Sequence, residues 1–209
     1  MAKLINGIFG GYTGTLGNRI GYCRNGNNYI RTKPKSVNDV KTKAQQNQRN
    51  RFKLIVQLMK KLKPIIDIGF RNPPGDTSPM NKATSINLRK AIKGTYPNLK
   101  INPEKLVISS GNLTGCYDAS MQFTDEVAAS IRWYNEPVGN ASSKDKVMAL
   151  LYNTSKNEVV CSPDGAKRQD ENLQLSIPKT WIGDTIAGYI AFYSKENRSD
   201  TNYLGLKKL

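Results

Sequence analysis

The side chains that could do chemistry in this sequence are mainly cations, and three of them fall on a predicted hairpin near the N-terminus. Arg19, Arg24 and Arg31 lie in two short β-prone runs on either side of an Asn–Gly turn. Tyr22 and Tyr29 lie among them. Arginine beside aromatic side chains on a β-ribbon is compatible with a nucleic-acid-binding surface, although the pattern has low specificity. The same pattern is also a common way to cover a small core, so both interpretations stay open.

A second set of cations falls on a predicted helix over residues 40–63. At about 100° per residue, apolar side chains gather on one side of this helix and basic ones on another. The basic residues are Lys43, Arg49, Lys53, Lys60 and Lys61. Such a run is usually a solvated face, but this segment carries no acid after Asp39, so ion pairs within the helix cannot stabilise it. The absence of acids favours phosphate contact, and we predict that these five residues and the three hairpin arginines bind nucleic acid.

The distribution of charge supports the same expectation. The chain has 209 residues, a formal net charge of +16 and no histidine. Residues 1–100 contain 20 Lys plus Arg and 3 Asp plus Glu, whereas residues 101–209 contain 12 and 13. Seventeen excess cations on one half repel one another unless counterions or a partner neutralise them. The asymmetry therefore indicates a basic module that meets a polyanion, joined to a neutral module.

Residues for catalysis or for metal binding are scarce. Without histidine there is no Ser–His or Cys–His arrangement and no His-liganded metal. The three cysteines are widely spaced, which predicts reduced thiols and neither a disulfide framework nor a metal site. The acidic pairs Asp125–Glu126 and Asp170–Glu171 are adjacent in sequence, so on strands their side chains point to opposite faces. We expect a protein that is not an enzyme and that needs no cofactor.

Glycines mark the first 36 residues. Gly11, Gly14 and Gly17 are three residues apart, a spacing that can let backbone approach a phosphate closely. No Gly-Lys-Ser/Thr sequence follows, and no strand–helix pattern supports a dinucleotide fingerprint. The favoured interpretation is an extended, flexible arm that orders only against a partner.

The elements that must position the cations lie in three predicted regions. Residues 1–36 form a glycine-rich basic arm and hairpin, residues 37–103 a basic helical segment, and residues 104–209 a β-sandwich domain. In the helical segment, Pro64 ends or kinks the first helix, residues 65–70 are a short apolar run, and residues 81–93 form a second helix.

After residue 104 the hydrophobic period changes to two. Residues 117–124 and 127–134 alternate apolar and polar side chains. Further β-prone runs are 105–109, 146–152, 158–162, 172–177, 185–194 and 201–206. Seven or eight short strands separated by turn residues predict an antiparallel sandwich of immunoglobulin or fibronectin type. We expect Trp133 and Trp181 to be core or corner anchors. The fold class is thus α+β, with a basic arm or hairpin, two helices and an all-β sandwich.

Several segments of the chain together carry a family resemblance. They are GIFGGYTGTLGNRIGY (7–22), NYIRTKP (28–34), TKAQQNQRNRFKLIVQLMKKLKPIIDIGF (42–70), ATSINLRKAIKGTYP (83–97), LVISSGNLTG (106–115), PKTWIGD (178–184) and NYLG (202–205). This combination resembles a family of uncharacterised bacterial proteins, a domain of unknown function common in the Bacteroides group, over nearly the whole chain. About the first 50 residues also resemble phage and other mobile-element proteins. The resemblance implies no established activity and no catalytic residues.

Two hypotheses about function follow. The first is a structural protein of an assembly, such as a phage-like virion component, whose basic half contacts nucleic acid or another polyanion while the sandwich packs against copies of itself or other subunits. The second is a protein- or glycan-binding module that uses loops of the sandwich, among them the turns at 139–145 and 153–157. A third arrangement is a monomer whose basic arm adds a strand to the sandwich.

The start of the chain lacks the apolar core of a secretory signal, and no run is long enough to span a membrane. We therefore expect a soluble protein in the cytoplasm or in a virion, without a membrane partner.

Overall fold

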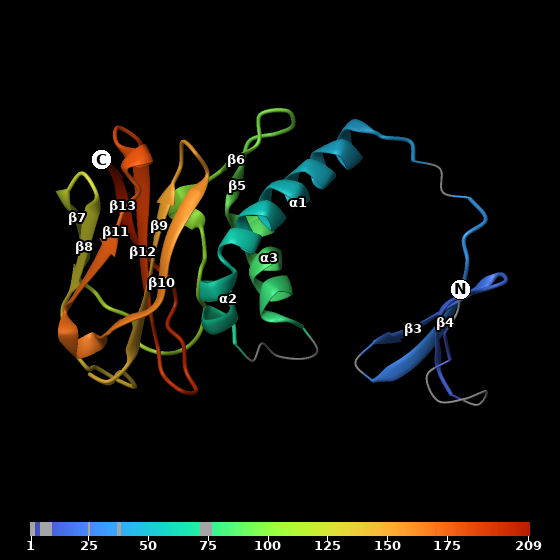
Figure 1. Cartoon of the computed structure of the whole chain (residues 1–209), viewed down its shortest axis with the longest axis horizontal. Coiled ribbons are helices and arrows are strands. Elements are labelled where there is room, and N and C mark those ends of the chain that lie inside the picture. The colour runs from blue at the N-terminus through green and yellow to red at the C-terminus, as the bar shows by residue number, and fades with distance from the viewer. Residues whose placement is uncertain (1–2, 5–9, 25, 37–38, 72–76) are drawn as a thin grey trace. The chain divides into compact units, whose positions relative to one another are not determined.

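The computed structural model describes residues 3–4, 10–24, 26–36, 39–71 and 77–209. The chain divides into two compact units, Met1–Thr42 and Lys43–Leu209, and each is described by itself. The fold is mixed α+β, with an N-terminal sheet, three helices and an antiparallel sandwich (Figure 1). None of the helices in the described ranges is long and apolar enough to cross a membrane.

The first unit is a small antiparallel sheet. Its strands are β1 (Lys3–Leu4), β2 (Tyr12–Leu16), β3 (Arg19–Arg24) and β4 (Asn27–Thr32), in the order β1-β2-β3-β4. The predicted hairpin is therefore present as β3 and β4. The prediction of an extended arm that orders only against a partner is wrong for residues 12–16, because they form β2 and pair with β3. Residues 1–2, 5–9 and 25 of that arm lie outside the described residues, and the four strands form a sheet of their own.

Glycine is required where this sheet is narrow. A Cβ on Gly21 would lie 2.3 Å from the carbonyl oxygen of Tyr12, so β2 and β3 can approach each other only with glycine there. Gly17, with a φ of 56°, lies in the β2–β3 turn, where an L-residue would be strained.

Three helices open the second unit: α1 (Lys43–Lys61), α2 (Lys63–Gly69) and α3 (Pro79–Lys90). The sequence predicts α1 and α3, but the α2 region is expected only to be a short apolar run. Pro64 lies in the first turn of α2, where a missing N–H leaves no hydrogen bond unmade. It therefore starts a new helix as the first one ends. Ser78 caps α3 by accepting a hydrogen bond from the Asn81 N–H at 3.2 Å.

A short connection leads from the helices to the sandwich. It contains the two-stranded pair β5 (Ile92–Lys93) and β6 (Lys100–Ile101), followed by a single 3-10 turn, Pro103–Lys105. The prediction of a strand at 105–109 is wrong, because this segment has no strand and continues as irregular chain. Its amides are used elsewhere: the N–H groups of Ile108 and Ser109 both donate to Thr201 Oγ1 at 2.9 Å.

Seven strands form the sandwich. They are β7 (Ala119–Asp125), β8 (Ala128–Trp133), β9 (Lys146–Asn153), β10 (Glu158–Lys167), β11 (Asn172–Ser176), β12 (Thr185–Tyr193) and β13 (Asn202–Lys208). One sheet has the order β10-β9-β12-β13 and the other β11-β8-β7, all antiparallel. This is the two-sheet architecture predicted from the period-two patterning.

The four-stranded sheet is covered on both faces. Met148 and Leu150 of β9 pack into a core shared with the helices, which also contains Ile55 of α1. Val147 and Leu151, on the other face of β9, pack into a core shared with the three-stranded sheet. Residues Val147–Asn153 are consequently all buried, and β9 is a continuous apolar run without alternation. The helices and the four-stranded sheet thus share one of the two cores. Figure 1 shows the helices beside this sheet.

A buried ion pair joins the loops at one end of the sandwich. Arg168 Nε lies 3.5 Å from Asp145 Oδ2, and both side chains are almost completely buried. The Arg168 guanidinium also donates to the carbonyl oxygens of Gly115 and Thr114 and lies 3.9 Å from the centre of the Phe192 ring. Trp133 Nε1 donates to the Arg168 carbonyl oxygen at 2.7 Å. Trp133 is therefore a core anchor, as expected, and buried Trp181 is another.

Candidate polyanion-binding surfaces

One face of the N-terminal sheet carries two of the predicted arginines beside a tyrosine stack. The register pairs Tyr22 with Tyr29, Ile20 with Arg31 and Arg24 with Asn27. Directly opposed residues of antiparallel strands point to the same side, so these six side chains share one face, which we name the tyrosine face. The Tyr22 and Tyr29 rings are stacked with centroids 5.4 Å apart and are about 40% and 44% exposed. Arg24 and Arg31 are exposed at opposite ends of this stack.

The third hairpin arginine lies on the opposite face. Arg19 pairs with Thr32 and alternates with Ile20, which places it away from the tyrosine face. The structure thus brings together Arg24 and Arg31 and separates Arg19 from them. Arg19 is exposed as well, so it is a natural internal comparison for the two arginines beside the tyrosines.

Helix α1 collects three of its predicted cations along its exposed side. Arg49, Lys53 and Lys60 recur at spacings of four and seven, which is close to whole turns of a 3.6-residue helix. All three are exposed, whereas the opposite side of the helix buries Ile55 and Leu58. We name this row of three residues the α1 stripe. Phe52, which is 52% exposed, lies one turn from Arg49.

The two remaining helix cations lie apart from the stripe. Lys43 is the first residue of α1. Lys61 donates to the carbonyl oxygen of Asn157, in the turn between β9 and β10, and so fixes the end of the helix to the sandwich. A further cation that the sequence does not single out, Arg51, donates to the Leu88 carbonyl oxygen at 3.1 Å and joins α1 to α3.

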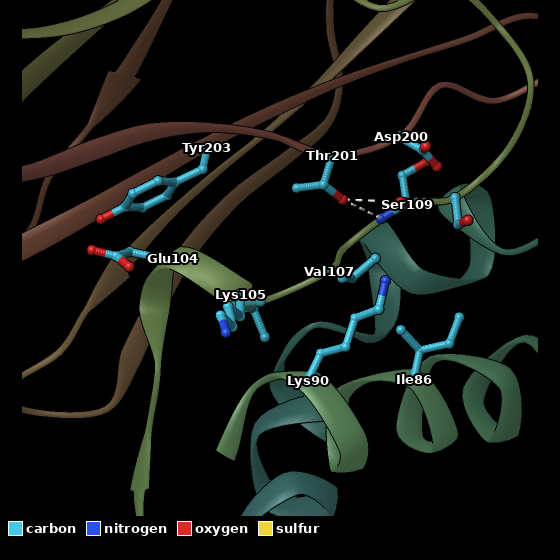
Figure 2. A pocket seen from close by; sticks show the side chains of 11 residues that line it. Ile86, Lys90, Glu104, Lys105, Val107, Ser109, Asp200, Thr201 and Tyr203 are labelled. Atoms are coloured by element: carbon cyan, nitrogen blue, oxygen red, sulfur yellow. Dashed lines mark hydrogen bonds between the residues drawn. The ribbon is translucent and has the colours of Figure 1, made fainter. Parts of the chain in front are cut away.

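A cavity between α3, the 104–110 segment and the start of β13 mixes both signs of charge. Lys90 and Lys105 line it together with Glu104 and Asp200 (Figure 2). Thr201, also in the lining, holds the 108–109 backbone by accepting two hydrogen bonds and donating one to the Ser109 carbonyl oxygen. Equal numbers of cations and anions leave this cavity without a preference for an anionic ligand.

A second cavity lies at the loop end of the sandwich and is strongly cationic. Five of its ten lining residues are basic and one is acidic. The basic ones are Arg71, Lys144, Lys146, Lys195 and Arg198. We name it the loop-end cavity. Sequence reasoning does not find it, because these residues are far apart in the chain and no spacing signals their convergence.

The described residues contain no group of three or more Cys, Asp or Glu side chains that could hold a metal ion. One of the two acidic pairs has local structural contacts: Asp170 accepts from the Lys167 N–H, and Glu171 accepts from the Asn135 N–H. All three cysteines are free thiols. Burial raises the pKa of Cys116 to about 11, so this thiol stays protonated near neutral pH.

The order and pairing of the seven strands define a fibronectin type-III-like sandwich. In the same unit a helical layer packs against it, and the N-terminal sheet forms a unit of its own. The chain belongs to a family of unknown function, DUF6266, whose model matches residues 11–205. This assignment agrees with the expected family of uncharacterised proteins and brings no activity with it.

Two solved structures are similar to this chain at low sequence identity. The chain is similar to the fn3 domain of the human collagen alpha-1(XX) chain, with 8% identity, a TM-score of 0.34 and coverage of 47% of this chain and 87% of that one. It is also similar to a two-domain fibronectin type-III segment of chicken tenascin, with 16% identity, a TM-score of 0.33 and coverage of 48% and 51%. The comparison with curated proteins gave no match.

Proposed function

We propose that this protein is a non-enzymatic structural component of an assembly, and that its basic N-terminal half contacts nucleic acid or another polyanion. The observation that carries the proposal is the tyrosine face, where Arg24 and Arg31 flank the exposed Tyr22–Tyr29 stack. Guanidinium groups provide charge-assisted hydrogen bonds to phosphates, and aromatic rings provide surfaces on which bases stack.

The α1 stripe adds a second basic surface. Arg49, Lys53 and Lys60 offer three cations in a row along about three turns of helix, suited to a run of phosphates. Contacts of this kind do not read sequence, so the affinity depends steeply on salt and only weakly on base identity.

The sandwich supplies the assembly part of the proposal. Its partners are copies of this chain or other subunits, which would pack against the outer strands. A phage-like virion is the setting we favour, because the first 50 or so residues resemble mobile-element proteins. No cofactor and no membrane enters the proposal.

The experiment is a fluorescence-anisotropy titration of labelled single-stranded DNA and RNA with the full chain at two salt concentrations. We expect binding at low salt that weakens strongly as salt rises. Arg31→Gln should reduce the slope of log affinity against log salt by about 0.7–1, because one phosphate contact is lost.

The matched control is Arg19→Gln, which removes the same charge from the opposite face of the same sheet. It should leave affinity closer to that of the unchanged protein than Arg31→Gln does. No binding at low salt, or binding that does not respond to salt, would contradict the proposal; equal effects of the two variants would remove the tyrosine face from it.

A second candidate is a protein- or glycan-binding module that uses loops of the sandwich. One observation favours it: the 142–146 segment and the 193–198 turn line a common cavity. The 153–157 turn lies at the other end of β9 and does not take part. Deletion of residues 1–42 tests the tyrosine face against the loops, since loop-mediated binding of a protein or glycan would survive it and nucleic-acid binding through the tyrosine face would not.

A further inference from the structure

The loop-end cavity has the size of a small-molecule site. Its volume is about 650 Å³, within the range of roughly 300–1,000 Å³ that is usual for ligand pockets. It is formed where the end of α2, the segment before β9 and the turn after β12 meet, all within the second unit. Ile68 and Tyr193 provide apolar surface, and the remainder of the lining is polar or charged.

The charges that line this cavity are not balanced. Lys146 forms an ion pair with Asp164, and the one acidic lining residue, Asp145, is already held by buried Arg168. Among the described residues, no acidic side chain forms an ion pair with Arg71, Lys144, Lys195 or Arg198. Four cations therefore line one cavity without carboxylate partners. Their mutual repulsion is unfavourable unless an anion is bound.

Arg198 is held in place by the backbone, with part of its guanidinium left over. The residue is only about 6% exposed. Nε donates to the Ile68 carbonyl oxygen at 2.9 Å, and Nη1 donates to the carbonyl oxygens of the 194–197 turn. Nη2 makes no hydrogen bond with the described residues. The arginine is thus positioned in advance, and one of its nitrogens remains available to a ligand.

A second arginine lies close to Arg198. Both arginines line the same cavity, and burial and the positive charge of Arg71 both lower the pKa of Arg198. Two arginines and two lysines from three separate segments suit an anion with several charged oxygens better than a single carboxylate.

We propose that the loop-end cavity binds a small phosphorylated molecule that carries more than one phosphoryl group. Arg198 and Arg71 contact the phosphoryl oxygens, Lys144 and Lys195 add positive charge, and Ile68 and Tyr193 contact the organic part. This site is separate from the tyrosine face and does not depend on polyanion binding there.

The test is isothermal titration calorimetry of the full chain with three probes: inorganic phosphate, pyrophosphate and ADP, at about 0.15 M salt to suppress unspecific binding. We expect one pyrophosphate per chain, bound more tightly than inorganic phosphate. ADP should bind at the same site, and tighter binding of ADP than of pyrophosphate would identify a contact with the organic part. Absence of saturable binding of both pyrophosphate and ADP overturns the proposal.

The variant Arg71→Gln/Lys195→Gln removes two cations from the cavity. Neither side chain forms a hydrogen bond or ion pair with another described residue, so the variant should fold. The matched control is Lys90→Gln/Lys105→Gln, which removes the same charge from the balanced cavity of Figure 2. We expect about tenfold or greater weakening for the first pair only. Equal weakening in both variants would show general electrostatic attraction and overturn the site.

Discussion

Strands β4 and β9 are similar in length and opposite in environment. Every residue of β4, Asn27–Thr32, is exposed, whereas all residues of β9 after Lys146 are buried. Packing on two faces determines the side chains of β9. Burial contributes little to β4, so Tyr29 and Arg31 do not pack into a core and lie at the surface. The two units therefore differ at these strands: β9 lies between two cores, and β4 presents its side chains at the surface.

The largest expected effect concerns the buried ion pair of the second unit. Arg168→Leu leaves the Asp145 carboxylate buried without its partner, which should lower the free energy of unfolding by about 3–5 kcal/mol. Denaturation followed by tryptophan fluorescence reports on this unit, because both tryptophans are buried there. Arg132→Leu, at an exposed position of β8, should change stability by no more than about 0.5 kcal/mol. Similar losses in both variants would contradict the role of the pair.

An intermediate effect should appear at alkaline pH. The pKa of Cys116 is raised by burial to about 11 from an ordinary value of 9.0. The protonated thiol therefore contributes stability that is fully present below about pH 9 and is lost as the pH rises through 11, up to about 2–3 kcal/mol. Unfolding measured at both ends of this window should show a larger loss for the unchanged protein than for Cys116→Ala. Parallel losses would mean that other groups dominate the alkaline response.

The smallest effect belongs to the first unit. Tyr29→Ala removes the stack with Tyr22 and should destabilise the N-terminal sheet by about 0.5–1.5 kcal/mol. Hydrogen exchange measured on peptides should show faster exchange in residues 19–32 and no change in residues 146–153. If exchange in β9 accelerated as well, the two units would be energetically coupled and the contrast between them would weaken.

Much of the fold could be predicted from local patterns. The Asn–Gly turn located the hairpin of β3 and β4, and alternation located β7 and β8. Helix α2 is not predicted, because seven residues are too few for a helical period to show. Pro64 predicts the end of the first helix, although it also lies in the first turn of the next one. The irregular 105–109 segment looked like a strand because its apolar residues pack into the shared core without pairing.

The candidate surfaces were only partly within reach of the sequence. Alternation along the hairpin already separates Arg19 from Arg24, and the turn register brings Arg24 and Arg31 to one face. The loop-end cavity has no such signal, since Arg71 and Arg198 meet only after the helices and the sandwich have packed. Convergence of this kind is a property of tertiary structure, and it can be found only there.

The shared core has a practical consequence for anyone who wishes to isolate the fibronectin-like part of this protein. Cutting before residue 104 would uncover Met148, Leu150, Tyr152 and Tyr189, which the helices now shield. An exposed apolar surface on a β-sheet promotes aggregation. A fragment for separate expression should therefore begin at α1, so that the helices still cover the outer face of the four-stranded sheet.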